Sequence, residues 1–312
     1  MDDLTPPAAE RRHPDVREVI VVSSPKAGTG AGREQLPALT KKLDAAGIPV
    51  FTTTDIKELK QRLEALAGSR VVVVAAGGDG TLALVADNVG SDVPLVPMPF
   101  GTENLLARYF GHTSAAEDVF ATITGGTSFF LDAGRANGQL FLVMASCGFD
   151  AEVVRGLHLR RSGHINRFSY TRPILRALRR YKFPVLNITI DQQDSAIECA
   201  WAFAFNLPRY GGGLSIEPGA VGNDGQLDLI AFQHGGIARG LKYLMGIATG
   251  RHTRFKDVVR KKAQTIEIHS DRLVPYQLDG DYVGRLPLKI ETLAKRVHLL
   301  LPSQISVEKT HS

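Results

Sequence analysis

Apolar residues in the first 110 positions gather in short runs, and stretches with the spacing of amphipathic helices lie between these runs. The strand-like runs are 18–23, 50–54, 71–76 and 94–98, and the helix-like stretches are 36–46, 55–66 and 82–89, with another after 104. Short β-branched runs bounded by glycine are typical of buried strands in a parallel sheet. The alternation predicts an α/β domain with helices on both faces of a parallel sheet.

The pattern changes near residue 129, where strand-like runs begin to dominate. These runs are 140–147, 185–191, 197–206, 226–232, 264–270, 274–278, 286–292 and 296–301, and only 167–182 and 237–249 have helical character. Many strands with turn signals between them predict a mostly antiparallel all-β domain of sandwich or barrel type. We expect domains at 17–132 and 133–302, a disordered lead-in at 1–16 and a tail at 303–312.

The composition is that of an ordinary globular protein, with 312 residues, 44% hydrophobic and 22% charged. No apolar stretch approaches the roughly 20 residues that a membrane-spanning helix needs. The first 15 residues are polar and contain proline, unlike a signal or transit peptide. Cys147 and Cys199 lie in apolar sequence, so we expect buried free thiols in a reducing compartment, the cytoplasm.

Residues 77–81 read Gly-Gly-Asp-Gly-Thr and directly follow the apolar run 71–76. Open α/β sheets bind ligands at the carboxyl ends of their strands, and glycines there let backbone N–H groups approach phosphate. The carboxylate of Asp79 would repel a phosphate unless a metal ion lay between them. The loop therefore indicates a metal–nucleotide site, and the alternative is a tight turn in which Asp79 caps the following helix.

Four further clusters of small and acidic residues lie at turns or near the ends of other predicted strands. They are 97–104 (Pro-Met-Pro-Phe-Gly-Thr-Glu-Asn), 210–213 (Tyr-Gly-Gly-Gly), 223–228 (Asn-Asp-Gly-Gln-Leu-Asp) and 278–281 (Leu-Asp-Gly-Asp). The last cluster places two carboxylates two residues apart across a glycine. The alternative for Asp279–Asp281 is a hairpin turn of the Asp-Gly kind.

Together these motifs resemble the catalytic domain of the diacylglycerol kinase family, in particular its bacterial lipid kinases, with sphingosine and ceramide kinases as relatives. The matching segments are Pro25–Gly28, Gly77–Thr81, Gly101–Asn104 with Ala107 and Arg108, Gly148–Ala151, Gly211–Gly213, Asp224–Asp228 and Asp279–Gly280. They occur in family order from about residue 19 to 300. The glycine loop is shared with NAD kinases, whereas the 101–108 and 224–228 segments are typical of lipid kinases.

The resemblance implies that 17–132 binds the nucleotide and that 133–302 binds the lipid. The residues implied to line the ATP site are Ser24, Pro25, Lys26, Ala27, Gly28, Thr54, Gly77, Gly78, Asp79, Gly80, Thr81, Leu82, Ala83, Thr102 and Asn104. Asp79 would act catalytically on the triphosphate through Mg²⁺ and water, and Asp132 would belong to the same acidic network.

The resemblance also implies a structural Mg²⁺ held by Asp224 and the backbone carbonyls of Val221 and Gln226. Asp279 and Asp281 would be the catalytic carboxylates for transfer of the γ-phosphoryl group of Mg·ATP to a lipid hydroxyl. Which of these two carboxylates is the general base is left open. Ser24 stands where the family usually has Asn, and Asp281 stands where it usually has Glu, one methylene longer.

Positive charge is concentrated between residues 153 and 190, which contain nine Lys or Arg residues and no acid, while the net charge of the whole chain is +5. The segment Arg155–Lys182 is expected either to contact anionic lipid at the inner membrane face or to be a solvated basic face. It lacks a recognised nucleic-acid-binding motif, so no nucleic-acid partner is expected. Whether the protein forms a homodimer is left open.

Two other functions fit parts of the pattern. An NAD kinase-like enzyme with a soluble substrate would use the same glycine loop. A non-catalytic nucleotide or lipid sensor would keep the fold without turnover, and Asp281 in place of glutamate favours this alternative.

Overall fold

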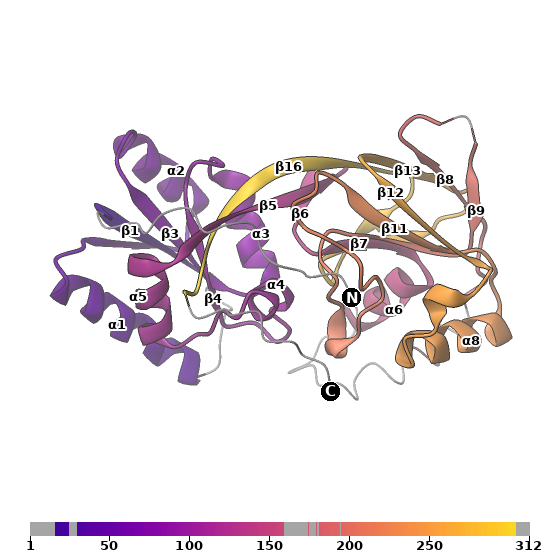
Figure 1. Ribbon diagram of the computed structural model, residues 1–312, viewed down its shortest axis with the longest axis horizontal. Coiled ribbons are helices and arrows are strands. Elements are labelled where there is room, and N and C mark those ends of the chain that lie inside the picture. Colours follow the sequence, from indigo (N-terminus) through magenta and orange to yellow (C-terminus); the bar gives the residue numbers. More distant parts are fainter. Residues whose placement is uncertain are drawn as a thin grey trace. The chain divides into compact units, whose positions relative to one another are not determined.

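The computed structural model describes residues 16–24, 30–158, 174, 179, 181–193 and 195–303. The chain forms two compact units (Figure 1). Unit 1 contains the chain up to Leu131 together with the segment from Arg296 onward, and unit 2 is Asp132–Lys295. The last strand thus ends in unit 1, and the domain boundaries expected from the sequence, 17–132 and 133–302, stay a prediction.

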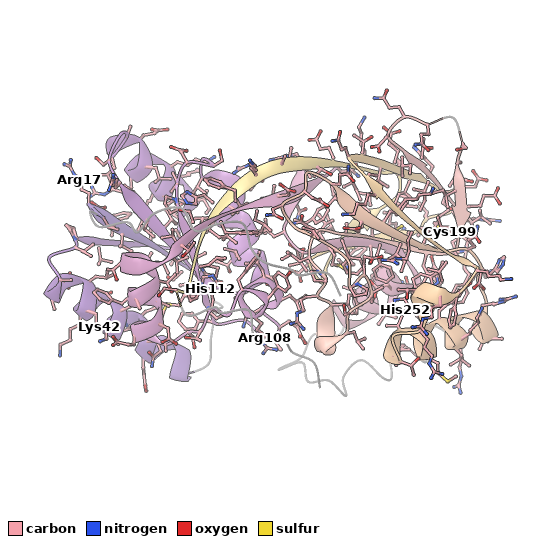
Figure 2. All side chains as sticks on the ribbon, in the orientation of Figure 1. Arg17, Lys42, Arg108, His112, Cys199 and His252 are labelled. Atoms are coloured by element: carbon pink, nitrogen blue, oxygen red, sulfur yellow. The ribbon has the colours of Figure 1, made fainter. Side chains whose placement is uncertain are left out.

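Unit 1 is built on a parallel sheet. Its elements are β1 (Glu18–Ser23), α1 (Gly30–Ala45), β2 (Val50–Thr53), α2 (Ile56–Ala65), β3 (Val71–Gly77), α3 (Asp79–Asn88), β4 (Leu95–Pro99), α4 (Leu105–Tyr109) and α5 (Ala116–Gly125). The strand order is β2-β1-β3-β4 with every pair parallel. Figure 2 marks Arg108 near the end of α4.

The core of unit 1 explains why its strands are so apolar. Every residue of β3 is buried, because helices cover both faces of the sheet. On one face Leu39 of α1 and Val119 of α5 pack against Val72 and Val96. The α/β domain predicted from the sequence is confirmed.

Unit 2 is a sandwich of two antiparallel sheets. Its elements are β6 (Gln139–Phe141), β7 (Met144–Gly148), α6 (Phe149–His158), β8 (Leu186–Ile190), β9 (Ile197–Cys199), β10 (Trp201–Phe205), η2 (Gly211–Gly213), β11 (Leu227–Phe232), α8 (Ile237–Ala248), η3 (His252–Arg254), β12 (Val258–Ala263), β13 (Thr265–His269), β14 (Pro275–Leu278) and β15 (Asp281–Arg285). Strands β5 (Thr127–Ala136) and β16 (Leu288–Leu301) connect it to unit 1.

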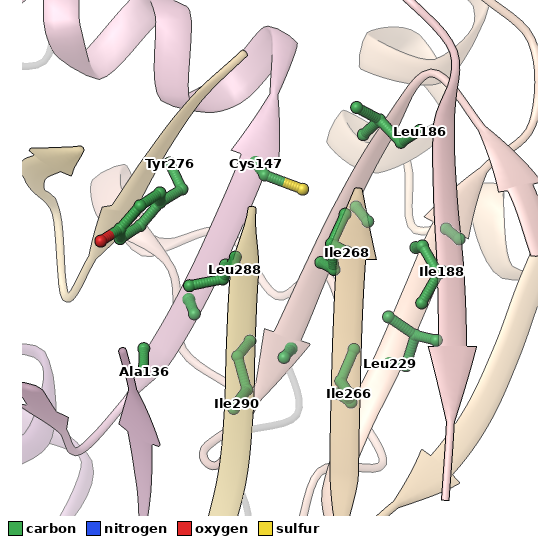
Figure 3. Packing of buried hydrophobic residues seen from close by; sticks show 14 of the residues in the cluster. Ala136, Cys147, Leu186, Ile188, Leu229, Ile266, Ile268, Tyr276, Leu288 and Ile290 are labelled. Atoms are coloured by element: carbon green, nitrogen blue, oxygen red, sulfur yellow. The ribbon is translucent and has the colours of Figure 1, made fainter. Parts of the chain in front are cut away.

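One sheet has the order β12-β11-β10-β7-β14-β15, and the unit 2 part of the other has the order β16-β13-β8-β9. Side chains from the two sheets interdigitate in one core, where Ile266, Ile188 and Leu229 pack with Cys147 (Figure 3). The sandwich predicted from the sequence is confirmed. Cys147 and Cys199 are buried free thiols, and burial raises the pKa of both.

Several predicted elements differ in detail. The run 140–147 is two strands, and 286–292 and 296–301 belong to the single strand β16. Helix α6 and strand β12 were not predicted. The expected helix at 167–182 lies almost entirely outside the described residues. No helix in the described part of the chain is long and apolar enough to cross a membrane.

Candidate nucleotide and catalytic sites

The residues predicted to bind the nucleotide gather at one edge of the unit 1 sheet. Ser24 follows β1, Thr54 follows β2, the glycine loop follows β3 and Thr102 follows β4. Because the four strands are parallel, all of these positions lie at the carboxyl edge. The Ser24 N–H donates to the carbonyl of Ala76 at 3.1 Å, which ties the end of β1 to β3. Residues 25–28, also predicted to bind ATP, lie outside the described residues.

The glycine loop and the 100–104 loop are joined directly. The Phe100 N–H donates to the Gly77 carbonyl at 2.9 Å. Asn104 has a left-handed backbone, with φ of 49°, and its side chain bonds both backbone groups of Gly101, at 2.9 and 2.7 Å. A Cβ on Gly101 would lie 2.7 Å from the Cα of Gly78. The two loops therefore form one backbone surface that requires glycine at this contact.

Asp79 is oriented by the helix that follows β4. Its carboxylate accepts the N–H groups of Leu105 at 2.9 Å and Leu106 at 3.2 Å, and so caps α4 rather than its own helix α3. Burial raises the pKa of Asp79, and these two hydrogen bonds oppose the rise. Each oxygen accepts one N–H and retains a lone pair, which fits a water-linked Mg²⁺. The residue is thus both a cap and a candidate ligand-binding carboxylate.

In unit 2, Asp279 and Gly280 are the two central residues of the hairpin that joins β14 to β15. Their φ values are 48° and 89°, as a type I′ turn requires, and Leu278 pairs with Asp281 across the turn. The hairpin alternative for this motif is therefore correct as a description of the backbone.

The two carboxylates of this hairpin have different environments. Asp279 accepts three backbone N–H groups, from Leu142 at 2.8 Å, Val143 at 2.8 Å and Met144 at 2.9 Å. Asp281 begins β15 and is exposed. Asp279 therefore fixes the hairpin to the segment before β7, whereas Asp281 presents its carboxylate to solvent.

A buried polar network holds this hairpin through its backbone. The Gln277 Oε1 accepts the Gly280 N–H at 2.7 Å, and its Nε2 donates to Ser146 Oγ at 2.9 Å and Asp150 Oδ2 at 3.3 Å. The hydroxyls of Ser146 and Tyr210 also donate to Asp150. Burial raises the pKa of Asp150, and these three donors oppose the rise.

Sequence reasoning missed most of this network. Asp150 and Tyr210 lie in two of the motifs noted above, but neither was assigned a role. Gln277 carried no signal, because one glutamine in a strand is indistinguishable from an ordinary surface residue.

Asp132 is fully buried in unit 2, where Oδ2 accepts the Gly225 N–H at 2.6 Å and Oδ1 accepts the Lys295 N–H at 2.7 Å. These bonds tie the 221–228 turn to β16. The expectation that Asp132 shares an acidic network with Asp79 stays a prediction.

The turn predicted to hold a structural Mg²⁺ already contains a cation. The ammonium of Lys262 pairs with Asp224 Oδ2 and lies 3.9 Å from Asp228, while Asp224 Oδ1 accepts the Gln226 N–H at 3.1 Å. The described residues contain no group of three or more His, Cys, Asp or Glu side chains arranged for a metal. In this structure Lys262 pairs with the one carboxylate of the predicted site, and the site of Asp224, Val221 and Gln226, two of whose ligands would be backbone carbonyls, stays a prediction.

Asp228 is the other carboxylate of this turn. It is buried, and its Oδ2 has no hydrogen-bond partner among the described residues. Burial raises the pKa of Asp228 to about 6, although Lys262 opposes the rise.

Comparison with known proteins identifies both units. Residues 18–136 match the model of the diacylglycerol kinase catalytic domain, and residues 143–301 match that of the YegS C-terminal NAD kinase beta sandwich-like domain. The second match alone covers half of the chain. The chain belongs to the diacylglycerol kinase family. It is therefore a kinase, and membership implies nucleotide use and supports a role as a lipid kinase.

Relatives in this family are similar over almost the whole chain. Proteins named diacylglycerol kinase from Mycobacterium tuberculosis and Bacillus subtilis are 28% identical over 306 residues and 23% identical over 298 residues. These matches cover 94% and 93% of this chain, and 97% and 98% of the relatives. The structure of a putative diacylglycerol kinase from Bacillus anthracis has the same fold, with a TM-score of 0.72, 21% identity, and coverage of 93% of this chain and 99% of that one.

Proposed function

We propose that this kinase transfers the γ-phosphoryl group of Mg·ATP to a lipid hydroxyl, with a diacylglycerol as the first candidate acceptor. The names of its relatives motivate this acceptor. The observation that carries the proposal is the difference between the two hairpin carboxylates. Asp279 uses its oxygens on three backbone N–H groups, while Asp281 is exposed and available to a substrate.

The nucleotide is assigned to the surface that the two loops of unit 1 form. Backbone N–H groups near Gly78 and Gly80 suit phosphate oxygens, because glycines have no side chain of their own to obstruct the approach. Mg²⁺ bound with the nucleotide would neutralise charge on the phosphates, and Asp79 is its proposed water-linked partner. Thr54, Thr81, Thr102 and Asn104 remain proposed contacts at the same edge.

Asp281 is the proposed general base, which accepts the proton of the lipid hydroxyl as that oxygen attacks phosphorus. Phosphoryl transfer depends mainly on positioning and on stabilising charge, so the support of the base matters as much as its identity. Gln277 holds the turn through the Gly280 N–H, and Asp279 holds it to the segment before β7. We assign positioning roles to both residues.

The test is a transfer assay with labelled ATP and a panel of diacylglycerol, monoacylglycerol, phosphatidylglycerol, sphingosine, ceramide and NAD. We expect label on diacylglycerol and its loss in Asp281→Asn. Asp271→Asn, at another exposed aspartate of unit 2, is the matched control and should retain full activity. Label on NAD alone would establish the soluble-substrate alternative, and ATP binding without transfer to any acceptor would establish the sensor.

A further inference from the structure

Helix α8 (Ile237–Ala248) has an apolar face that nothing in the described structure covers. Ile237, Leu241 and Met245 are 53%, 49% and 71% exposed. Residues four positions apart lie on one side of a helix, so these three side chains form a continuous stripe. Large apolar side chains that line up in this way are a recurrent feature of interaction surfaces.

The opposite face of α8 is firmly anchored. Tyr243 is fully buried, with its ring 4.9 Å from that of Phe232 and 6.0 Å from that of Trp201. After the helix, His252, marked in Figure 2, contacts the Ile216 carbonyl through Nε2 at 2.6 Å. The apolar stripe is therefore presented by a fixed helix.

Two more exposed apolar residues belong to segments near the start of α8. Val185 is 56% exposed and Leu273 is 76% exposed. The Ser270 hydroxyl donates to the Val185 carbonyl at 2.7 Å, so the segments that carry these residues are adjacent. Gly235, just before α8, packs against Phe183, since a Cβ on this glycine would lie 2.3 Å from the Phe183 Cβ.

The chain on both sides of the stripe carries mostly positive charge. No Asp or Glu occurs between Asp228 and Asp257, while this interval contains Arg239, Lys242, Arg251, Arg254 and Lys256. Arg239 and Lys242 pair with Asp257, at 2.8 and 3.0 Å. The other three are exposed, and none of them forms an ion pair within the described residues. All three belong to the segment that follows α8 and packs against its last turn at Gly246, and we call them the basic rim.

We propose that the α8 surface, made of Ile237, Leu241, Met245 and the rim of Arg251, Arg254 and Lys256, docks the kinase on a bilayer that contains anionic lipids. The proposal rests on the proposed function, because a lipid acceptor resides in a bilayer. An apolar helix face inserts at the boundary of headgroups and acyl chains, and nearby cations are attracted to anionic headgroups. A second copy of the chain fits less well, because a symmetric contact would bring two basic rims together.

The first test is co-sedimentation with vesicles of phosphatidylcholine, with and without phosphatidylglycerol, at low salt. We expect the native protein to bind mixed vesicles, and Leu241→Glu/Met245→Glu to bind about tenfold less or weaker still. Leu84→Glu is the matched control, because Leu84 is 52% exposed on helix α3 of unit 1, and its binding should equal the native level.

Two more variants sharpen this test. Arg251→Ala/Arg254→Ala should lose about tenfold in binding to mixed vesicles and little on phosphatidylcholine alone. Met245→Trp should increase binding to both, because tryptophan favours the membrane interface. Binding of the double glutamate variant at the native level would overturn the proposal. So would a native dimer that this variant dissociates, since the stripe would then serve self-association.

The second test separates docking from chemistry. Short-chain diacylglycerol dispersed in detergent should be phosphorylated equally by the native protein and the double glutamate variant, whereas diacylglycerol in mixed vesicles should be phosphorylated about tenfold more slowly by the variant. Native protein that binds vesicles through α8 but transfers no phosphate to either form would contradict the proposed function and support the surface. Equal turnover of vesicle substrate by both proteins would contradict the surface alone.

Discussion

The substitution Asp279→Asn should destabilise unit 2 strongly, because its three backbone hydrogen bonds depend on both carboxylate oxygens. Oδ1 accepts from Val143 and Met144, and Oδ2 accepts from Leu142. Asparagine tolerates the φ of 48° at this position, so the change affects the oxygens and leaves the turn geometry unstrained. The variant therefore isolates the contribution of the carboxylate to the stability of unit 2.

The expected magnitude follows from counting these bonds. Asparagine keeps one oxygen for Val143 and Met144, but its NH₂ faces the N–H of Leu142, and Leu142 is 1% exposed. Losing one charge-assisted bond costs about 1.5 to 3 kcal/mol, and two bonds that become neutral lose roughly half of their strength. The total loss is about 3 to 4 kcal/mol, which for a domain of this size lowers the melting temperature by about 10 °C.

The assay is urea denaturation followed by fluorescence of Trp201, the single tryptophan of the chain. Trp201 is 2% exposed in β10, opposite Gly148 of β7, so its emission reports the unfolding of unit 2. Asp281→Asn is the comparison variant. Because Asp281 is exposed, its stability should stay within about 0.5 kcal/mol of native, while kcat falls by about 100-fold or more.

Two results would refute this reasoning. An unchanged urea midpoint for Asp279→Asn would show that the three bonds contribute little to stability. A folded Asp279→Asn without activity, beside an Asp281→Asn with native kcat, would reverse the assignment of the base.

Two further predictions concern other parts of the molecule. Gly101→Ala should weaken ATP binding about tenfold in titration calorimetry, because its Cβ would collide with the neighbouring glycine loop, whereas Gly125→Ala, with no atom within 4 Å of the new Cβ, should bind like the native protein. Burial raises the pKa of Asp228 to about 6, so the folded state favours the protonated form and loses stability as pH rises from about 4 through 6. Asp228→Asn, uncharged at every pH, should therefore be more stable than native at pH 8 by about 1 to 2 kcal/mol and nearly equal at pH 4, and a difference independent of pH in thermal melts would contradict this.

Sequence predicted the architecture well where burial alone dictates the residue types. The run 71–76 was recognised as a strand because helices cover both faces of the sheet and every position must be apolar. Strand β12 was missed because its middle residues, Arg260, Lys261 and Lys262, are all charged and exposed and so show no apolar run. The break between β6 and β7 was also missed, because the carboxylate that binds this segment belongs to Asp279, more than 130 residues away.

The candidate site was likewise predicted only in part from the sequence. Parallel topology predicts that loops after neighbouring strands meet at one edge, so the nucleotide loops were found from local motifs. The capping of α4 by Asp79 joins positions 26 and 27 residues apart, and the bond from Gln277 to Ser146 joins positions 131 apart. Local sequence contains no signal for such long-range contacts. Contacts of this kind also hold the Asp279 carboxylate in place, whereas the Asp281 carboxylate is exposed.

The hairpin and catalytic interpretations of residues 279–281 are therefore compatible. A type I′ turn requires residues that accept positive φ, which Asp279 and Gly280 do, and Asp281 is the first side chain beyond the turn. Because Gln277 and three backbone N–H groups hold this turn, it has little freedom to compensate for a shorter side chain. Aspartate in place of the longer glutamate withdraws the carboxylate by about 1 Å, a distance that matters in positioning a base. Under the proposed function, a base at Asp281 would require the acceptor hydroxyl to approach β15 more closely than a glutamate at this position would.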